Sequence, residues 1–151
     1  MRRLAWLIAT AGGIGYAPVA PGTVASAVAA ALWYALPAAP ATQWLVCAVA
    51  VLIGTWAAGL TAKQARSKDP QSIVIDEFAG MWLALAGAPH TPLVLTAAFL
   101  LFRLFDIAKW PPMKQLERLP GGLGIMMDDV AAGLIARAIL ALAIIFRSTG
   151  S

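Results

Sequence analysis

Charged residues are scarce in this chain of 151 residues, where Asp, Glu, Lys and Arg together make up 12%. A typical soluble domain has about twice that share and is about 45–50% apolar, whereas the AVILMFWYC residues here reach 61%. A globule of this length exposes too much surface to be so apolar in water, which excludes an ordinary soluble domain and a disordered chain. The net charge of +4 comes from few, scattered cations, which excludes a nucleic-acid-binding surface. A lipid environment is the simplest explanation.

Cysteine and histidine are almost absent, with one residue of each. The single Cys47 excludes an internal disulfide and a cysteine-based zinc cluster, and its apolar surroundings predict a packed or lipid-facing thiol. The single His90 excludes a site built from several histidines, and we interpret it as a loop residue. A metal site in this chain would therefore use oxygen ligands, for which the seven acids are the candidates.

The apolar stretches are long enough for membrane helices, and prolines divide them. Residues 4–62 contain no charged residue, and we interpret their beginning, after Arg2 and Arg3, as a surface or partly inserted helix. Further apolar helices are expected at 23–36, 42–62, 78–102 with a turn at 89–92, and 130–146. The sequence thus predicts an all-α fold, a single membrane-embedded domain over residues 1–151. We expect a small integral membrane bundle of four to five membrane helices, some short or re-entrant.

Charge is distributed unevenly over this predicted topology. With the N-terminus on the cytoplasmic side, the loops 36–42 and 88–92 lie outside and carry no formal charge. The loops 63–77 and 109–129 lie inside, as do eight of the eleven cations: Arg2, Arg3, Lys63, Arg66, Lys68, Lys109, Lys114 and Arg118. This agrees with the positive-inside rule. All seven acids also fall inside, which the rule does not predict, because Asp and Glu contribute little to orientation.

Five of these acids lie where helices meet the inner loops: Asp76, Glu77, Asp106, Asp128 and Asp129. Helix capping would explain Asp76 or Asp128 taken alone. An ion pair with Arg103 or Lys109 would explain Asp106, because both cations lie three residues away. Adjacent acids are not needed for capping, however, and carboxylates at membrane depth are usually functional. Their mutual repulsion and their hard oxygens predict a site for one or two ions of Mg²⁺, Mn²⁺ or Ca²⁺.

Two glycine-rich loops lie near these acids in the predicted topology. Residues 20–26 lead into a helix, and residues 121–124 precede the Asp-Asp pair. Backbone N–H groups at such positions bind anions. Candidate phosphate-binding residues are therefore Thr23, Ser26, Gly121 and Gly122, with the cations Arg103 and Lys109. A phosphate site beside a Mg²⁺ site at a membrane face predicts a phosphate-bearing lipid as the ligand, while Asp69 and Glu117 remain as loop charges.

Four motifs in this order resemble those of the phosphatidylglycerophosphatase A family, namely residues 13–26, 72–82, 102–109 and 121–133. The resemblance implies a multi-pass protein of a bacterial cytoplasmic (inner) membrane. It also implies Mg²⁺-dependent hydrolysis of the terminal phosphate of phosphatidylglycerophosphate, which gives phosphatidylglycerol and phosphate. One departure follows Asp106, where this chain reads Lys-Trp-Pro-Pro at 109–112 and the family often reads Lys-Pro-Trp-Pro. Arg137 has no counterpart in the motifs, and we interpret it as snorkelling or paired inside the bundle.

The resemblance and the demands of phosphoryl transfer together assign roles. The expected metal ligands are Asp76, Glu77, Asp128 and Asp129. The expected catalytic residues are Asp76, Glu77, Asp106, Lys109 and Asp129, with Arg103 and Lys109 on the phosphate. Asp106 could be a metal ligand or a general base. The attacking group is left open between a metal-activated water and a carboxylate.

Rival functions are weighed against the same residues. A type 2 phosphatidic acid phosphatase needs two histidines, and the start motif of a CDP-alcohol phosphotransferase and an Asp-x-Asp-x-Thr motif are absent. A small membrane cation transporter or channel subunit could use the carboxylates, although its acids should then spread through the membrane depth. A structural subunit could pack through the small residues Gly54, Ala58 and Gly59, which we expect to pack within the bundle instead.

Overall fold

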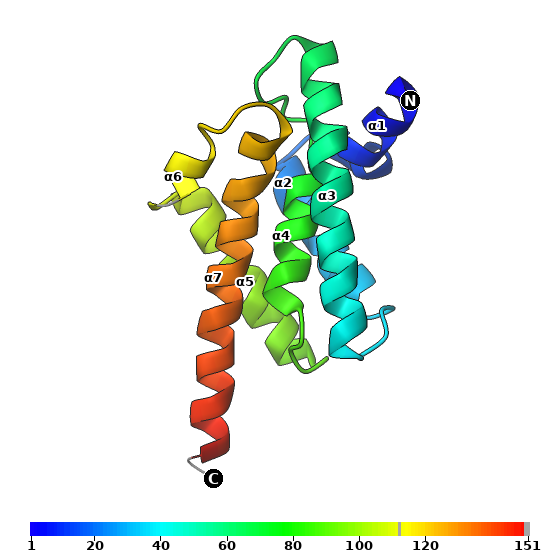
Figure 1. Ribbon diagram of the computed structural model, residues 1–151. Coiled ribbons are helices and arrows are strands. Elements are labelled where there is room, and N and C mark those ends of the chain that lie inside the picture. The colour runs from blue at the N-terminus through cyan, green and yellow to red at the C-terminus, as the bar shows by residue number, and fades with distance from the viewer. Residues whose placement is uncertain (112, 150–151) are drawn as a thin grey trace.

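The computed structural model describes residues 1–111 and 113–149, and in these ranges every regular element is a helix (Figure 1). The elements are α1 (Arg2–Ala9), the 3-10 helix η1 (Ala11–Tyr16), α2 (Pro21–Trp33), α3 (Pro40–Ala65), α4 (Ile75–Leu85), α5 (Pro92–Ala108), α6 (Met113–Leu116) and α7 (Gly122–Thr149). The predicted all-α class is confirmed for this part of the chain. Pro112, which belongs to the departure from the family motif, lies outside the described residues.

Proline positions set where three of the helices begin. Pro21, Pro40 and Pro92 each occupy the first turn of a helix, where a missing N–H removes no intrahelical hydrogen bond. The Thr91 side chain also accepts a hydrogen bond from the Val94 N–H at 3.3 Å, which caps α5. Three of the prolines that interrupt the apolar runs therefore act as helix starts, and the predicted hairpin over 78–102 is observed as α4 and α5.

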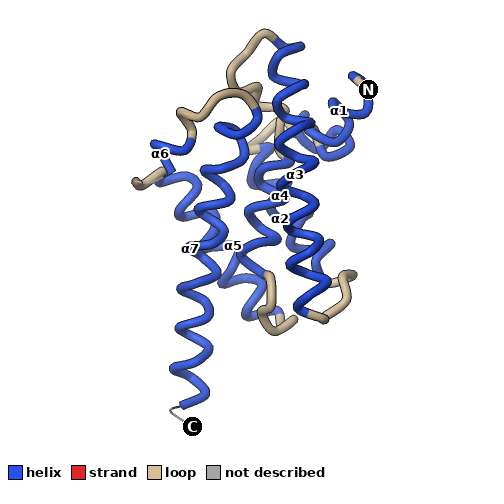
Figure 2. Tube along the Cα trace, viewed as in Figure 1, coloured by secondary structure: helices blue, strands red, loops and turns tan. Residues whose placement is uncertain are grey.

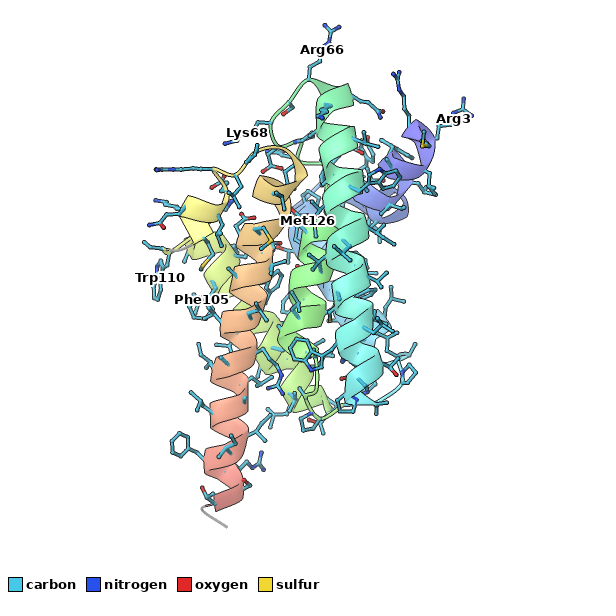
Figure 3. All side chains as sticks on the ribbon, in the orientation of Figure 1. Arg3, Arg66, Lys68, Phe105, Trp110 and Met126 are labelled. Carbon is cyan, nitrogen blue, oxygen red and sulfur yellow. The ribbon has the colours of Figure 1, made fainter. Side chains whose placement is uncertain are left out.

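The short helix α4 lies at the centre of the bundle and contacts α2, α3, α5 and α7. The connections fall at two opposite ends of the molecule, as the ribbon and the trace show (Figures 1 and 2). The loops 34–39 and 86–91 lie at one end, and the loops 66–74 and 117–121 lie at the other. Arg3, Arg66 and Lys68 project from this second end (Figure 3). The charged loops and the uncharged loops that the sequence distinguishes thus lie at opposite ends of the bundle.

Two of the described helices, α3 and α7, are long and apolar enough to cross a membrane. With 13 and 11 residues, α2 and α4 fall short of the usual span, since 11 residues rise only about 16 Å against about 30 Å of hydrocarbon. Large apolar side chains such as Leu52 and Leu142 are well exposed on the two long helices. The structure supports two membrane-capable helices, and the expected count of four to five remains a prediction.

Glycines permit a very close approach of α4 and α7. A Cβ added to Gly133 would lie 2.2 Å from the carbonyl oxygen of Gly80, and one added to Gly80 would lie 2.7 Å from the carbonyl oxygen of Asp129. Side chains larger than hydrogen would therefore separate the two helices. This contact brings the acidic turn of α7 beside the first turn of α4.

The N-terminal segment closes the end that carries the charged loops. The backbone N–H of Val74 donates to the Ala9 carbonyl at 2.9 Å, which ties the last residue of α1 to the residue before α4. Trp6 donates to the Tyr16 hydroxyl at 3.0 Å on the outside, and Leu4 and Leu7 are exposed. This face suits the predicted surface helix, because indole and phenol groups favour a membrane interface.

Candidate active site

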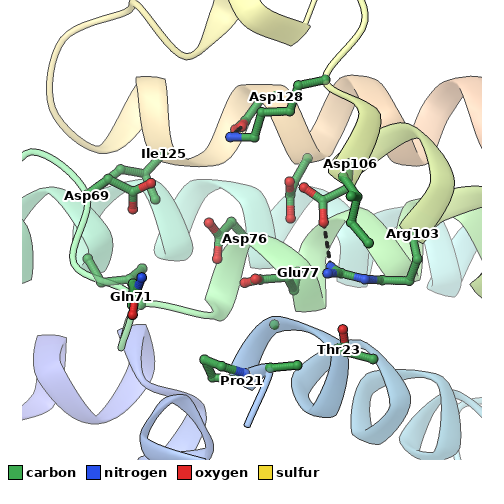
Figure 4. A pocket seen from close by; sticks show the side chains of 16 residues that line it. Pro21, Thr23, Asp69, Gln71, Asp76, Glu77, Arg103, Asp106, Ile125 and Asp128 are labelled. Carbon is green, nitrogen blue, oxygen red and sulfur yellow. Dashed lines mark hydrogen bonds and ion pairs between the residues drawn. The ribbon is translucent and has the colours of Figure 1, made fainter.

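A cavity of about 360 Å³ lies between α2, α4, α5 and α7, near the charged end of the bundle (Figure 4). Its lining combines acids, two cations, the start of α2 and three isoleucines: Ala20, Pro21, Gly22, Thr23, Asp69, Gln71, Ile73, Asp76, Glu77, Arg103, Asp106, Ile107, Lys109, Ile125, Asp128 and Asp129. All five acids that the sequence placed at helix ends contribute to it. The cavity therefore joins residues that are more than 100 positions apart in the chain.

Three carboxylates form the tightest group in this cavity. Ligand oxygens of Asp76, Glu77 and Asp129 lie within 4.8 Å of one another. One oxygen of each, Oδ1 of Asp76, Oε2 of Glu77 and Oδ2 of Asp129, is buried and has no hydrogen-bond partner in the part of the chain described. Unpaired buried carboxylate oxygens are costly unless a cation balances them. The donor set is all oxygen, so it fits a hard divalent cation such as Mg²⁺.

Burial and like charge disturb the titration of the α4 carboxylates. Burial, and then the charge of neighbouring Glu77, raises the pKa of Asp76 well above its ordinary value. Burial likewise raises the pKa of Glu77. Each shift disfavours the charged carboxylate, and a bound cation would reverse that preference. Neither acid acts as a helix cap, because no side-chain capping hydrogen bond forms at the start of α4.

Asp128 lies outside the three-carboxylate group, and its predicted role as a metal ligand alongside Asp129 stays a prediction. Its Oδ2 accepts a hydrogen bond from Lys109 Nζ at 3.1 Å, and no oxygen of it falls within the group. The physical reason is that α7 already begins at Gly122, so both acids lie inside a helix, where neighbouring residues point about 100° apart. One acid faces α4 and the other faces the chain after α5.

Lys109 is held in an unusual backbone conformation at the end of α5. Its φ of +44° is left-handed, a region that commonly belongs to glycine at helix ends. In this conformation Nζ contacts Asp128 and lies 3.5 Å from Glu117 Oε1. Burial lowers the pKa of Lys109, but the hydrogen bond and charge of Asp128 outweigh it and the pKa is raised. Lys109 is therefore a fixed cation at the cavity wall, and it pairs with Asp128 rather than with Asp106.

Arg103 supplies the second cation and links α5 to α2. Its guanidinium pairs with Asp106, as the spacing of three residues predicts, and both side chains are 14% exposed. The same Nη1 lies 3.5 Å from Ser26 Oγ, which itself donates to the Gly22 carbonyl at 2.8 Å. Ser26 is fully buried outside the cavity lining, so the structure makes it a support for Arg103 rather than a wall of the site.

Only one of the two glycine-rich loops contributes residues to the cavity lining. Thr23 and Gly22 line the cavity at the start of α2, and a Cβ on Gly22 would lie 2.1 Å from Glu77 Oε1. Gly121 and Gly122, for which the sequence predicts phosphate binding, lie outside the cavity lining. A Cβ on Gly122 would lie 2.0 Å from the Thr55 carbonyl, so this glycine serves the packing of α7 on α3. Helix packing and anion binding both select glycine, and the sequence alone does not separate them.

Asp69 and Gln71 line the cavity although the sequence gave no role to Gln71 and assigned Asp69 to a loop. Both precede α4 and lie across the cavity from Arg103 (Figure 4). The only available signal was their position in the polar stretch that leads directly into Asp76. The isoleucines of the lining carried no signal at all, since isoleucine is common throughout an apolar chain.

Polar residues outside the cavity stabilise the opposite end of the bundle. Arg137 donates to the carbonyls of Ala86 and Gly87 after α4, which is the pairing expected for a cation inside the bundle. The buried Gln43 accepts from the Gly87 N–H at 2.8 Å and contacts His90 at 2.8 Å. His90 is thus a loop residue remote from the acids, and Cys47 is packed in the core as expected.

Comparisons with known proteins agree on one family. The model of the family described as phosphatidylglycerophosphatase A matches residues 7–144. A phosphatidylglycerophosphatase A of Escherichia coli is 39% identical over 137 residues, which cover 89% of this chain and 80% of that protein. The Haemophilus influenzae protein of the same name is 36% identical over 134 residues, with 86% and 82% covered.

A Bacteroides thetaiotaomicron protein with the provisional name phosphatidylinositol-3-phosphatase is 38% identical over 146 residues, with 91% of each chain covered. No solved structure matches this chain. The match of the family model extends from α1 into α7 and includes every charged residue of the cavity. This chain therefore belongs to the phosphatidylglycerophosphatase A family of phosphatases.

Proposed function

We propose that this protein hydrolyses the terminal phosphate of phosphatidylglycerophosphate, with Mg²⁺ as cofactor, and releases phosphatidylglycerol and inorganic phosphate. The observation that carries the proposal is the group of Asp76, Glu77 and Asp129 beside two cations. Each of the three acids has one buried oxygen without a hydrogen-bond partner among the described residues. Phosphoryl transfer needs this combination, because negative charge on the phosphate oxygens must be neutralised while the reacting groups are held in line. The names of the Escherichia coli and Haemophilus influenzae relatives support the same substrate.

The residues divide the work by charge. Asp76, Glu77 and Asp129 would hold Mg²⁺, which neutralises phosphate oxygens and lowers the pKa of water when bound. Arg103 and Lys109 would bind the phosphate from the other wall, with Thr23 contributing its hydroxyl and the N-terminal end of α2. Asp128 and Asp106 hold these two cations in place, since each forms an ion pair with one of them.

In the reaction the bond between phosphorus and the headgroup oxygen breaks, and the departing oxygen takes a proton to become the alcohol of phosphatidylglycerol. The phosphate gains an oxygen that comes from water, either by direct attack or after attack by a carboxylate. Asp106 borders the cavity and accepts from Arg103, so it is placed to relay a proton as well as to orient the guanidinium.

We further propose a multi-pass orientation in a bacterial inner membrane with the cavity at the cytoplasmic face. Support comes from α3 and α7, which are long enough to cross, and from the cations gathered at the cavity end of the bundle. A lipid in the cytoplasmic leaflet would then present its phosphate at the depth of the carboxylate group. Membrane lipids are accordingly the expected surroundings of the exposed apolar helices.

Phosphate release by the purified protein in detergent micelles tests the proposal. The substrates are phosphatidylglycerophosphate, phosphatidic acid and phosphatidylinositol 3-phosphate, each with Mg²⁺ and with EDTA. We expect release from phosphatidylglycerophosphate that EDTA abolishes and that Asp76→Asn reduces at least about 1,000-fold, while the exposed-charge control Arg66→Gln matches the wild type. A preference for phosphatidylinositol 3-phosphate would instead indicate the substrate that the name of the Bacteroides relative gives. Cation flux across sealed liposomes that contain the protein, together with no phosphate release in micelles, would support the transporter alternative.

A further inference from the structure

An apolar groove of about 180 Å³ runs between α2 and α5 on the outside of the bundle. It is lined by Ala27, Ala30, Leu95, Thr96 and Phe99 and by no charged residue. The two residues from α2 are alanines: Ala27 is exposed and Ala30 is buried against the core. Larger side chains at these two positions would fill the groove, so its existence depends on the small residues of α2.

The groove lies on the same helix faces as the cavity. Ala27 and Ala30 follow Thr23 by four and seven residues along α2, and Phe99 and Leu95 precede Arg103 by four and eight along α5. Residues at these spacings share one side of a helix. Thr23 and Arg103 flank one side of the cavity on these two helices (Figure 4). The groove therefore continues from the cavity, one to two turns toward the uncharged end of the bundle.

A polar contact marks the boundary between the two compartments. Ser26 Oγ on α2 lies 3.5 Å from Arg103 Nη1 on α5, and Ser26 directly precedes the groove residue Ala27 in the chain. On one side of this contact lie the charged residues of the cavity, and on the other side the lining is alkyl and aromatic. An amphiphile would match both surfaces, with its anionic headgroup in the charged cavity and a hydrocarbon chain along the apolar groove.

We propose that this groove holds an acyl chain of the lipid whose phosphate is bound in the cavity. The inference rests on the proposed function, and it names the part of the substrate that the carboxylates do not touch. The lipid would reach the site laterally between α2 and α5, with Ala27 and Phe99 against its chain. In a bilayer the groove gains no hydrophobic free energy from the chain, so its contribution comes from packing and from orienting the headgroup.

Substitutions at the rim of the groove test the inference through substrate chain length. Ala27→Phe and Thr96→Phe both start from exposed positions, so the added ring fills the groove without entering the core. Ala138→Phe, at an exposed position of α7 away from the groove, is the matched control. Each protein is assayed with long-chain phosphatidylglycerophosphate and with the same headgroup lacking acyl chains. We expect the two groove variants to lose about tenfold in kcat/KM on the long-chain lipid and less than about twofold on the soluble headgroup.

Equal losses on both substrates, or no loss on the lipid, would overturn the inference. A second measurement does not depend on turnover: a phosphatidyl lipid with a photoreactive acyl chain is cross-linked to the protein in bilayers, and the labelled peptides are mapped. We expect labelling concentrated on α2 and α5 and reduced by Ala27→Phe, whereas even labelling of all exposed helices would refute the groove. If the wild type hydrolysed neither substrate, the proposed function would fail, and the cross-linking would still decide whether the groove binds lipid.

Discussion

The guanidinium of Arg103 donates to the carboxylate of Asp106 one turn further along α5, and both side chains are largely shielded from solvent. Ser26 of α2 approaches the same Nη1, while Nε is buried without a partner in the described part of the chain. An arginine has five N–H donors in a planar fork, so these contacts leave others for a ligand. The pair therefore presents a fixed fork of donors at the cavity wall.

Replacing the Arg103 guanidinium by an ammonium group should lower activity more than removing the Ser26 hydroxyl that contacts it. We expect Arg103→Lys to lower kcat/KM by about 100-fold, because an ammonium keeps the charge but loses bidentate geometry. Ser26→Ala removes the 3.5 Å contact with Arg103 and the hydrogen bond to the Gly22 carbonyl, and it should lower kcat/KM by less than about tenfold. Steady-state phosphate release measures both. Nearly wild-type activity in Arg103→Lys would show that the phosphate does not depend on a bidentate contact.

Neutralising one carboxylate of the metal-free group should stabilise the protein while removing its response to metal. Asp129 is 3% exposed and shares its small volume with Asp76 and Glu77, so Asp129→Asn relieves repulsion between buried like charges. In EDTA we expect the melting temperature of the variant in detergent to exceed that of the wild type by a few degrees, on the order of 1 kcal/mol. Excess Mg²⁺ should raise the wild-type melting temperature and leave the variant unchanged.

Asp69→Asn provides the control for that experiment, because Asp69 lines the cavity but is exposed and lies outside the three-carboxylate group. It should melt like the wild type in EDTA and retain the Mg²⁺ response. Destabilisation of Asp129→Asn in EDTA would mean that Asp129 accepts a structural hydrogen bond, and its assignment as a metal ligand would lose its physical basis.

Acidic conditions should weaken metal binding. Burial and the charge of Glu77 raise the pKa of Asp76, so the folded protein without metal holds a proton that the unfolded chain releases. Stability of the metal-free protein therefore falls as pH rises from the ordinary aspartate pKa through the raised one. Mg²⁺ must displace that proton, so the concentration for half-maximal activity should decrease as pH rises from acidic to neutral. Mg²⁺ titrations of activity at several pH values check this, and a flat dependence would contradict it.

The convergence of the acids was predictable because this chain has so few of them. In an apolar sequence with seven acids, five at helix ends on one side of the topology leave few alternatives to a common site. The starts of three helices were also predictable from proline positions, since Pro21, Pro40 and Pro92 all begin helices. Amino-acid composition and proline positions can be obtained from the sequence alone, and the folded structure keeps the features that they predict.

The division of labour among the acids was not predictable, because it depends on where α7 begins. A start near residue 130 would place Asp128 and Asp129 before the helix, whereas the observed start at Gly122 puts them on two different faces. The charge of Lys109 was visible in the sequence, but its left-handed backbone, and hence its choice of Asp128 over Asp106, was not. These features arise from packing between distant segments, on which single-sequence periodicity carries no information.

Lys109 offers a way to separate function from folding. A side-chain-bearing residue in the left-handed region costs about 1 kcal/mol, which Lys109→Gly would recover, while the lost pair with Asp128 opposes this gain. We expect the melting temperature to change little and phosphate release to fall by about 100-fold, because a cavity cation is lost. Lys114→Ala, an exposed lysine of α6, should retain activity and serves as the control. A large fall in melting temperature for Lys109→Gly would instead make the lysine a structural residue.

The close contact of α4 with α7 should control the geometry of the site from a distance. A methyl group at Gly133 would meet the Gly80 carbonyl at 2.2 Å, so Gly133→Ala must push the two helices apart. Such overpacking costs about 1–3 kcal/mol and would move Asp129 away from Asp76 and Glu77. We expect a lower melting temperature in EDTA and a higher Mg²⁺ concentration for half-maximal activity, although residue 133 touches no ligand. Ala138→Val on the exposed side of α7 should change neither quantity. An unchanged Mg²⁺ requirement in Gly133→Ala would show that the carboxylate group tolerates separation of its helices, contrary to a site built on this contact.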